Sequence, residues 1–439
     1  MRTNLAPSPV FTHEGAKASH VSPIEELRRT VLACMLFEKN FYESGEAVAN
    51  RIKRLVPLCK PHEVAELAIE AREKQRLRHA PLLLVRELAR DAKRFSVAQT
   101  LCRVIQRADE LAEFLALYWS AGKTPLAKQV KKGLACAFEK FDHYAISKYN
   151  RDAVVKLRDV LFLVHAKPKD EAQAALWKAL AEGTLTPPDT WEVALSGGAD
   201  KKEAFERLLR EGKLGYMALL RNLRNLQQAE VDPALVFEAL KAGAAKSKAL
   251  PFRYVAAARA VPAWEPQIDE AMQIAAGGLA KLPGSTVILV DVSGSMDAKL
   301  SAKSDLSRID AAAALAVLVR AVAEDCRVFT FSHALVEVPP RAGMALIDAV
   351  VRSQAHGVTY LGGALEALRS HVRIAADRII VITDEQSADS VGRPIGRGYI
   401  INVATAERGV GYGDWLHVNG FSEALVQYIQ ATEAAAVLP

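Results

Sequence analysis

Apolar residues recur at helical spacing from Ile24 to about Leu282. Ile24, Leu27, Val31 and Met35 fall near one face of a helix in which successive residues turn by about 100°. Strand patterns are nearly absent from this stretch. Further amphipathic segments follow near residues 47–57, 62–76, 82–91, 97–105, 109–119, 125–141, 153–164, 170–182, 202–211, 214–227, 233–242, 251–260 and 267–281.

Short breaks that contain Gly, Pro or Asp separate these segments, as at Lys60-Pro61 and at Pro187-Pro188-Asp189. Many short helices joined by short breaks are typical of an α-solenoid of paired, HEAT-like repeats. Because no strict sequence period accompanies them, an irregular helical domain is the alternative.

The pattern changes at Pro283-Gly284. Residues 285–290 (STVILV) form a continuous apolar, β-branched run, typical of a central parallel strand buried on both faces. Strands that alternate with helices predict a Rossmann-like, doubly wound parallel sheet. Further strands are predicted at 327–331, 378–383 and 398–404, and helices at 309–324, 343–353, 365–371 and 422–432.

The predicted organisation therefore has three parts. Residues 1–20, rich in Pro, Thr, Ser and Gly, form an extended N-terminal arm. Residues 21–284 form the helical-repeat domain, and residues 285–439 form the α/β domain.

Cysteine usage and hydropathy indicate the compartment. The five cysteines, Cys34, Cys59, Cys102, Cys136 and Cys326, are odd in number, far apart and without a CxxC pair. We therefore expect neither a disulfide framework nor a cysteine zinc site, which fits a reducing cytosol. The first residues lack the apolar core of a signal peptide, and no apolar run reaches the roughly 18 residues of a membrane span. A soluble, cytoplasmic protein is expected.

The net charge of +6 is unevenly distributed. Residues 1–284 carry 44 Lys and Arg against 34 Asp and Glu, a net charge of +10, whereas residues 285–439 carry 13 against 17, a net charge of −4. A polyanion, if one is bound, is therefore expected on the helical part. The alternative is a solvated helical surface with surplus lysines.

Oxygen-bearing side chains follow several of the predicted strands. The strand at 285–290 runs into Asp291, Ser293 and Ser295, Thr359 lies in a glycine-containing loop, and Asp384 ends another strand. Because ligands collect at the carboxyl edge of such sheets, these side chains are expected to lie together. Two carboxylates and three hydroxyls suit Mg²⁺ or Mn²⁺ and leave one position open for a carboxylate or phosphate. The alternative is a retained fold with an empty site.

This set resembles the metal-ion-dependent adhesion site (MIDAS) of the von Willebrand factor A family, whose pattern is DxSxS, then Thr, then Asp. All five positions are present in that order, each at a predicted strand end. The resemblance implies a von Willebrand A domain in the last third of the chain.

The helical part resembles the TROVE domain of Ro ribonucleoproteins, including bacterial and phage Ro-like proteins. The similar phrases are residues 37–43 (FEKNFYE), 77–82 (LRHAPL), 217–223 (MALLRNL) and 250–254 (LPFRY), and in the second part 383–386 (TDEQ). The order of the parts, helical repeats first and metal domain last, adds to the resemblance.

This resemblance implies a monomeric ring of helical repeats closed by the metal domain. It implies that small structured noncoding RNA of the Y type binds a basic outer surface and that single-stranded 3′ ends enter a central hole. Bacterial relatives act with an exoribonuclease such as polynucleotide phosphorylase, which places the protein in RNA quality control or processing.

Basic side chains of the helical part are the candidates for contacting RNA. Lys128 and Lys132 point away from the predicted apolar face of their helix, where they could meet phosphates. Solvated lysines, and for His165 a helix-end role, are the structural alternatives. The RNA-binding candidates are Lys128, Lys131, Lys132, Lys156, Arg158, His165, Arg76, Arg78 and His79.

Two other functions compete with RNA binding. The chain has no P-loop, GxSxG, HExxH or zinc-deaminase motif, so catalysis is not expected. A helical-repeat scaffold for proteins, whose metal binds an acidic residue of a partner, is the alternative. The +10 helical part and the TROVE-like phrases favour RNA.

Overall fold

The computed structural model describes residues 10–18, 22–32, 45–91, 95–196, 198–247, 249, 251–299, 306–372, 374–404, 409–411, 413–419 and 424–435. The FEKNFYE phrase and Cys34 lie outside these residues. The chain divides into two compact units, each of which is described by itself. One comprises Met1–Ser22, Leu32–Val48 and Asp200–Pro439, and the other comprises Pro23–Val31 and Ala49–Ala199.

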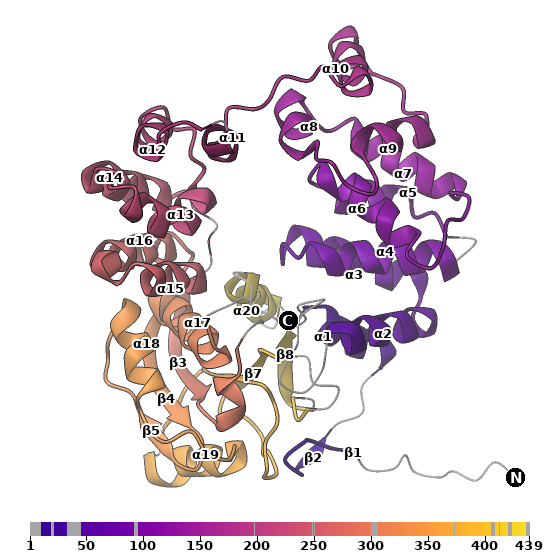
Figure 1. Cartoon of the computed structure of the whole chain (residues 1–439). Coiled ribbons are helices and arrows are strands. Elements are labelled where there is room, and N and C mark those ends of the chain that lie inside the picture. Colours follow the sequence, from indigo (N-terminus) through magenta and orange to yellow (C-terminus); the bar gives the residue numbers. More distant parts are fainter. Residues whose placement is uncertain are drawn as a thin grey trace, which may run out of the picture. The chain divides into compact units, whose positions relative to one another are not determined.

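The second unit is helical (Figure 1). Its apolar stripes are buried as the periodicity predicts; on α7, for example, Val130, Leu134 and Phe138 are fully buried. The helices that lie wholly or mostly in this unit are α1 (Pro23–Leu32), α2 (Gly45–Leu55), α3 (Pro61–Glu73), α4 (His79–Asp91), α5 (Ala98–Val104), α6 (Asp109–Tyr118), α7 (Lys128–Phe138), α8 (His143–Tyr149), α9 (Leu157–Val164), α10 (Glu171–Glu182) and α11 (Trp191–Ser196).

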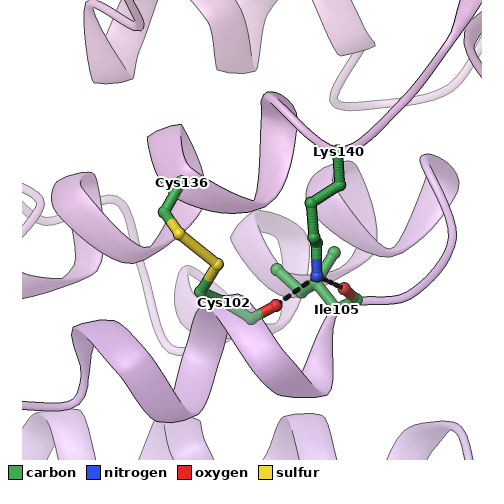
Figure 2. Close-up of a disulfide and its surroundings, with 4 residues drawn as sticks. All are labelled: Cys102, Ile105, Cys136 and Lys140. Carbon is green, nitrogen blue, oxygen red and sulfur yellow. Dashed lines mark hydrogen bonds between the residues drawn. A yellow bond between two sulfur atoms is a disulfide. The ribbon is translucent and has the colours of Figure 1, made fainter.

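Helices α5 and α7 are joined by a disulfide between Cys102 and Cys136 (Figure 2). The expectation that the cysteines stay unpaired is therefore wrong for this pair. Separation along the sequence did not exclude pairing, because packing of the two helices brings the two Cα atoms to 5.7 Å. Gly133 permits this packing, since a Cβ there would lie 2.8 Å from the carbonyl oxygen of Ala98.

Lys140 supports the same junction. Its ammonium group donates hydrogen bonds to the carbonyl oxygens of Cys102 and Ile105 at the end of α5 (Figure 2). A cation at a helix C-terminus is stabilising because the last carbonyls lack helical partners. Burial lowers the pKa of Lys140.

A buried ion pair connects α3 and α6. The Arg72 guanidinium donates to both carboxylate oxygens of Glu110, at 2.7 and 3.0 Å, and to the carbonyl oxygen of Val104. Glu110 also accepts from the backbone N–H groups of Gln106 and Arg107. The charges are therefore paired and hydrogen-bonded, as burial requires.

The first unit combines helices with a sheet (Figure 1). Helices α15 and α16 pack on α17 of the α/β part. The Met344 amide at the start of α18 donates to Asp269 of α16 at 2.9 Å. The helices before the sheet are α12 (Lys201–Arg210), α13 (Tyr216–Gln228), α14 (Pro233–Ala244), α15 (Pro251–Ala260) and α16 (Glu265–Gly277).

A six-stranded sheet follows in the order β5-β4-β3-β6-β7-β8. All neighbours are parallel except β4 and β5, which are antiparallel. The strands are β3 (Leu282–Asp291), β4 (Ala323–Phe331), β5 (Leu335–Glu337), β6 (Arg378–Thr383), β7 (Arg397–Asn402) and β8 (Trp415–Asn419), and the helices are α17 (Arg308–Val322), α18 (Gly343–Val351), α19 (Leu361–Ala367) and α20 (Ala424–Ala435). The predicted doubly wound sheet is confirmed.

Both faces of the central strands are buried. Val287 and Leu289 of β3 pack with Phe329 of β4 and with Leu365 of α19 on one face. The intervening residues of β3 point to the opposite face and are also buried, because side chains alternate along a strand. Helix α17, which packs against β3, β4 and β6, is buried along nearly its whole length. Its alanines permit this close packing.

The N-terminal arm contains a short antiparallel hairpin of β1 (Val10–Phe11) and β2 (Lys17–Ala18). Ala16 in this hairpin is 4% exposed and belongs to the same apolar cluster as the strands β3, β4 and β6. The hairpin therefore packs on the α/β part of its own unit. No helix in the described residues is long and apolar enough to cross a membrane.

Candidate metal centre and nucleic-acid interface

Four of the five predicted metal ligands lie at or just after the carboxyl ends of two neighbouring strands, whereas Thr359, which was expected at a strand end, lies in the loop between α18 and α19. Asp291 is the last residue of β3, and Asp384 directly follows β6, its neighbour in the sheet. Asp291, Ser293, Thr359 and Asp384 are fully buried, and Ser295 is 6% exposed. Buried side chains of this polarity need partners, since desolvation without one is costly.

Hydrogen bonds fix the first three donors. Asp291 accepts from the Ser293 amide at 2.9 Å and from the Thr383 hydroxyl at 2.6 Å. The Ser293 and Ser295 hydroxyl oxygens lie 3.2 Å apart. The turn they occupy is tied to the loop before Thr359, because the Gly294 amide donates to the carbonyl oxygen of Gly357 at 2.9 Å.

Thr359 provides the observation against which the fit of a metal ion is judged. Its backbone is held by the Ala388 amide, which donates to its carbonyl oxygen at 2.8 Å. Its hydroxyl is buried and makes no hydrogen bond of normal geometry with any described residue. A hard cation would satisfy a buried hydroxyl that has no protein partner. The described residues contain no group of three or more His, Cys, Asp or Glu arranged to hold a metal. A metal ion at this site would therefore need the Ser and Thr hydroxyls as ligands.

The electrostatics of the site also favour a cation. Burial, aided by the charge of Asp384, raises the pKa of Asp291 to about 7. Arg308, the first residue of α17, is 3% exposed and its guanidinium lies 3.6 Å from a carboxylate oxygen of Asp384. One guanidinium does not compensate two buried carboxylates. The metal motif gave no indication of Arg308.

A further carboxylate reaches the site from the N-terminal hairpin. Glu14 accepts a hydrogen bond from the Thr359 amide at 3.2 Å. Partial burial raises the pKa of Glu14. The charge of Asp384 adds to this rise, and hydrogen bonding by Thr359 partly opposes it. The sequence pattern gave no signal for this contact, which joins residues 345 positions apart.

Other polar residues near the site have their own partners. Glu385, next to Asp384, accepts from the side-chain NH₂ group of Asn402 at 2.6 Å and lies 3.3 Å from the His417 ring. His356 uses both ring nitrogens, one toward Asp297 at 2.7 Å and one toward the Val351 carbonyl oxygen at 2.9 Å.

The candidate RNA-binding residues differ in how their charges are used. Arg78 forms ion pairs with Asp109 and Glu113, so its charge is compensated. Lys156 lies 2.6 Å from Asp152. Arg76, with φ 55°, lies in the turn between α3 and α4. Burial, and next the charge of Arg78, lower the pKa of His79 at the start of α4.

The lysines of α7 are solvent-facing. Lys128 and Lys132 are exposed and Lys131 is half-buried. None of the three has an ion pair or hydrogen bond from its side chain to another described residue. Their charges are therefore available to an external anion.

Helix α9 carries a mixed aromatic and basic strip. Arg158 and His165 are exposed, and His165 ends the helix in the left-handed region at φ 53°. Between them Phe162 is 59% exposed. The spacings of four and three residues place the three side chains on one face. The periodicity of the sequence did not distinguish Phe162 from core residues.

Two further groups lie outside the list of RNA-binding candidates. On α8, the Lys148 ammonium lies 5.4 Å from the ring centre of Tyr144, which is 48% exposed. In the first unit, desolvation of the Arg253 guanidinium, and next the charge of nearby Arg221, lower the pKa of Arg253. Neither arginine has a carboxylate partner in the described residues.

Known proteins resemble both parts of the chain. Residues 182–277 match the TROVE domain family, and residues 286–386, which contain all five predicted metal ligands, match the von Willebrand factor type A domain family. A solved structure of the Ro (RSR) protein of Deinococcus radiodurans has the same fold, with a TM-score of 0.61 and 20% identity over 95% of this chain and 100% of that one.

A mouse protein, telomerase protein component 1, is 35% identical over 89 residues. This match covers 19% of the present chain and 3% of the mouse protein. The comparisons therefore establish a TROVE-domain match, a von Willebrand A match and the Ro fold.

Proposed function

We propose that this chain is a noncoding-RNA-binding protein of the Ro type, whose helices bind RNA and whose α/β part holds Mg²⁺ or Mn²⁺. The TROVE match and the Ro fold support it. The observation that carries it is the exposed strip Arg158, Phe162 and His165 on α9. A large apolar ring left in solvent between an arginine and a histidine is expected where nucleic-acid bases stack.

Phosphate contacts are proposed for the basic side chains that lack carboxylates. On α7 these are Lys128, Lys131 and Lys132. In the TROVE-matched segment they are Arg221 and Arg253, two neighbouring guanidiniums that a phosphate between them would stabilise. Such contacts provide affinity without reading the sequence.

Substitutions can separate stacking from charge. Phe162→Ala is expected to weaken binding of a single-stranded RNA by about 1–3 kcal/mol, roughly 5- to 150-fold in Kd. Leu58→Ala, at another exposed apolar residue, is the matched control and should leave Kd unchanged. Fluorescence anisotropy with labelled RNA measures both. Equal affinity of Phe162→Ala and wild type would exclude this strip as the stacking surface.

Charge reversal tests the lysines. Lys128→Glu with Lys132→Glu should lower the slope of log Kd against log salt by roughly 1.4–1.8, the contribution of two phosphate contacts. The control, Arg341→Glu with Arg352→Glu, makes the same charge change at exposed residues of the α/β part. Equal slopes for both double variants would locate the RNA elsewhere, and no RNA binding even at low salt would favour a protein scaffold instead.

For the metal, the proposed ligands are Asp291, Ser293, Ser295, Thr359 and Asp384. The ion would neutralise buried carboxylates and offer an electrophilic position to an acidic or phosphate group. Isothermal titration with Mn²⁺ should show one site that Asp291→Ala removes. Asp297→Ala, an exposed neighbour paired with His356, should retain it. Binding that persists in Asp291→Ala would refute the site.

The finer proposal follows from the family resemblance. It comprises small structured RNA of the Y type on a basic outer surface, single-stranded RNA ends in the centre of a monomeric ring, and delivery to an exoribonuclease. Sequencing of RNA that copurifies with the chain tests the RNA class directly.

A further inference from the structure

The turn of the N-terminal hairpin is built to sit on the two loops that carry Thr359 and Asp384. The Thr12 hydroxyl donates to the Ser387 carbonyl oxygen at 2.7 Å, and the His13 amide donates to the Gln386 side chain at 2.8 Å. Ala16 is buried in the apolar cluster of the sheet. The turn is therefore held in place by the hydrogen bonds of Thr12 and His13 and by the burial of Ala16.

The geometry of this turn directs Glu14 to the proposed ligands. The Thr12 amide donates to the Ala16 carbonyl oxygen at 2.8 Å, which closes the turn. Gly15 has φ 100°, a conformation that favours glycine. Glu14 lies between these residues, half-buried, with one carboxylate oxygen on the Thr359 amide. The Glu14 carboxylate therefore lies against the backbone of a proposed ligand.

The charge balance makes this arrangement unfavourable without a cation. Glu14 adds a third carboxylate to those of Asp291 and Asp384. The cationic side chain that the described residues place against these ligands is Arg308. The three carboxylates are not gathered into one cluster in the structure. A divalent cation supplies the charge needed to draw them together.

We propose that Glu14 is a ligand of the metal ion and fills the coordination position that Asp291, Ser293, Ser295, Thr359 and Asp384 leave open. This inference rests on the proposed metal site. In such sites the open position accepts an acidic group from a partner. Here the chain supplies that group from its own N-terminal hairpin, so an external carboxylate or phosphate must displace Glu14 to reach the ion.

The test compares Glu14→Gln with wild type in the full chain. Glutamine keeps the oxygen that accepts from the Thr359 amide but loses the charge. Mn²⁺ affinity by titration is expected to fall roughly tenfold or more, the scale of changes to groups that support a metal. Glu366→Gln, an exposed glutamate of α19 in the same unit, is the matched control and should not change the affinity.

A second readout separates a ligand from a residue that only stabilises the hairpin. Water-proton relaxation counts the water molecules on bound Mn²⁺. Glu14→Gln should gain one exchangeable water relative to wild type, and millimolar acetate should remove it again. In wild type, acetate should have little effect because Glu14 occupies the position.

The outcomes distinguish the two proposals. If wild type and Asp291→Ala bind Mn²⁺ equally or not at all, the metal site itself is wrong. If wild type binds, Asp291→Ala does not, and Glu14→Gln matches wild type in both affinity and water count, then Glu14 is not a ligand although the site stands. Hydrogen exchange of residues 10–18 shows whether Glu14→Gln retains the hairpin. If Glu14→Gln loses the hairpin but keeps the wild-type water count, Glu14 is likewise not a ligand of the metal ion.

Discussion

The Cys102–Cys136 bond allows a quantitative prediction about the helical unit. The bond links residues 34 positions apart, and in the chain-entropy description a closed loop of that size restricts the unfolded chain by about 4 kcal/mol at 25 °C. Replacing both cysteines by serine removes this restriction and leaves the packing at Gly133 and the hydrogen bonds of Lys140 in place. The native contacts therefore change little, and the loss is expected to come mainly from the unfolded state.

Native-state hydrogen exchange of the full chain measures this loss. Amides of α5 and α7 that exchange through unfolding of their unit should exchange up to roughly 10³-fold faster in the double variant, because each 1.4 kcal/mol is a factor of ten. A reductant should produce the same change in wild type. Replacement of Cys59 and Cys326, which are free, is the matched control. Equal exchange in oxidised wild type and the double variant would refute the reasoning.

Two further predictions concern the same unit. Glu110→Gln leaves Arg72 as a buried cation without its counter-charge and should cost about 3–5 kcal/mol, measured by urea denaturation followed in this unit. The matched change at an exposed ion pair, Glu73→Gln opposite Arg103, should lower the free energy of unfolding by less than about 1 kcal/mol. Equal losses for the two variants would show that burial does not determine the cost of removing the carboxylate. Gly133→Ala places a methyl group against α5 and should lower stability by about 1–3 kcal/mol, so an unchanged Tm would show that α5 and α7 can separate at no cost.

The regular elements could be predicted because their periodicity is strong and local. The buried run at residues 285–290 became β3, and the alanine-rich segment became α17. Elements whose patterns are short were missed, such as β5 and β8 at the sheet edges. The segment 125–141 was predicted as one helix, but α7 ends at Phe138 and Asp142 caps a separate α8 by accepting from the Ala145 amide.

The places of the candidate metal ligands in the fold could be predicted for a similar reason. Asp291 ends the buried strand β3 and Asp384 directly follows β6, and the sheet topology brings the carboxyl ends of these parallel strands together. Glu14 and Arg308 could not be found this way. Neither belongs to a motif, and their approach to the site depends on where the hairpin and α17 pack. The cysteine pair was missed because helix packing is equally invisible in the spacing of residues.

Net charge alone does not locate an RNA surface. The 44 Lys and Arg of residues 1–284 are not all available to an anion, since Arg72 and Arg78, for example, have carboxylate partners in their own unit. A cation already paired gains little from a phosphate, because it must exchange one partner for another. The surplus that can release counterions therefore resides where carboxylates are absent, at Lys128, Lys132 and Arg253. If binding depended on total charge instead, neutralising any one exposed arginine of the chain would lower the slope of log Kd against log salt as much as neutralising any one of these three residues.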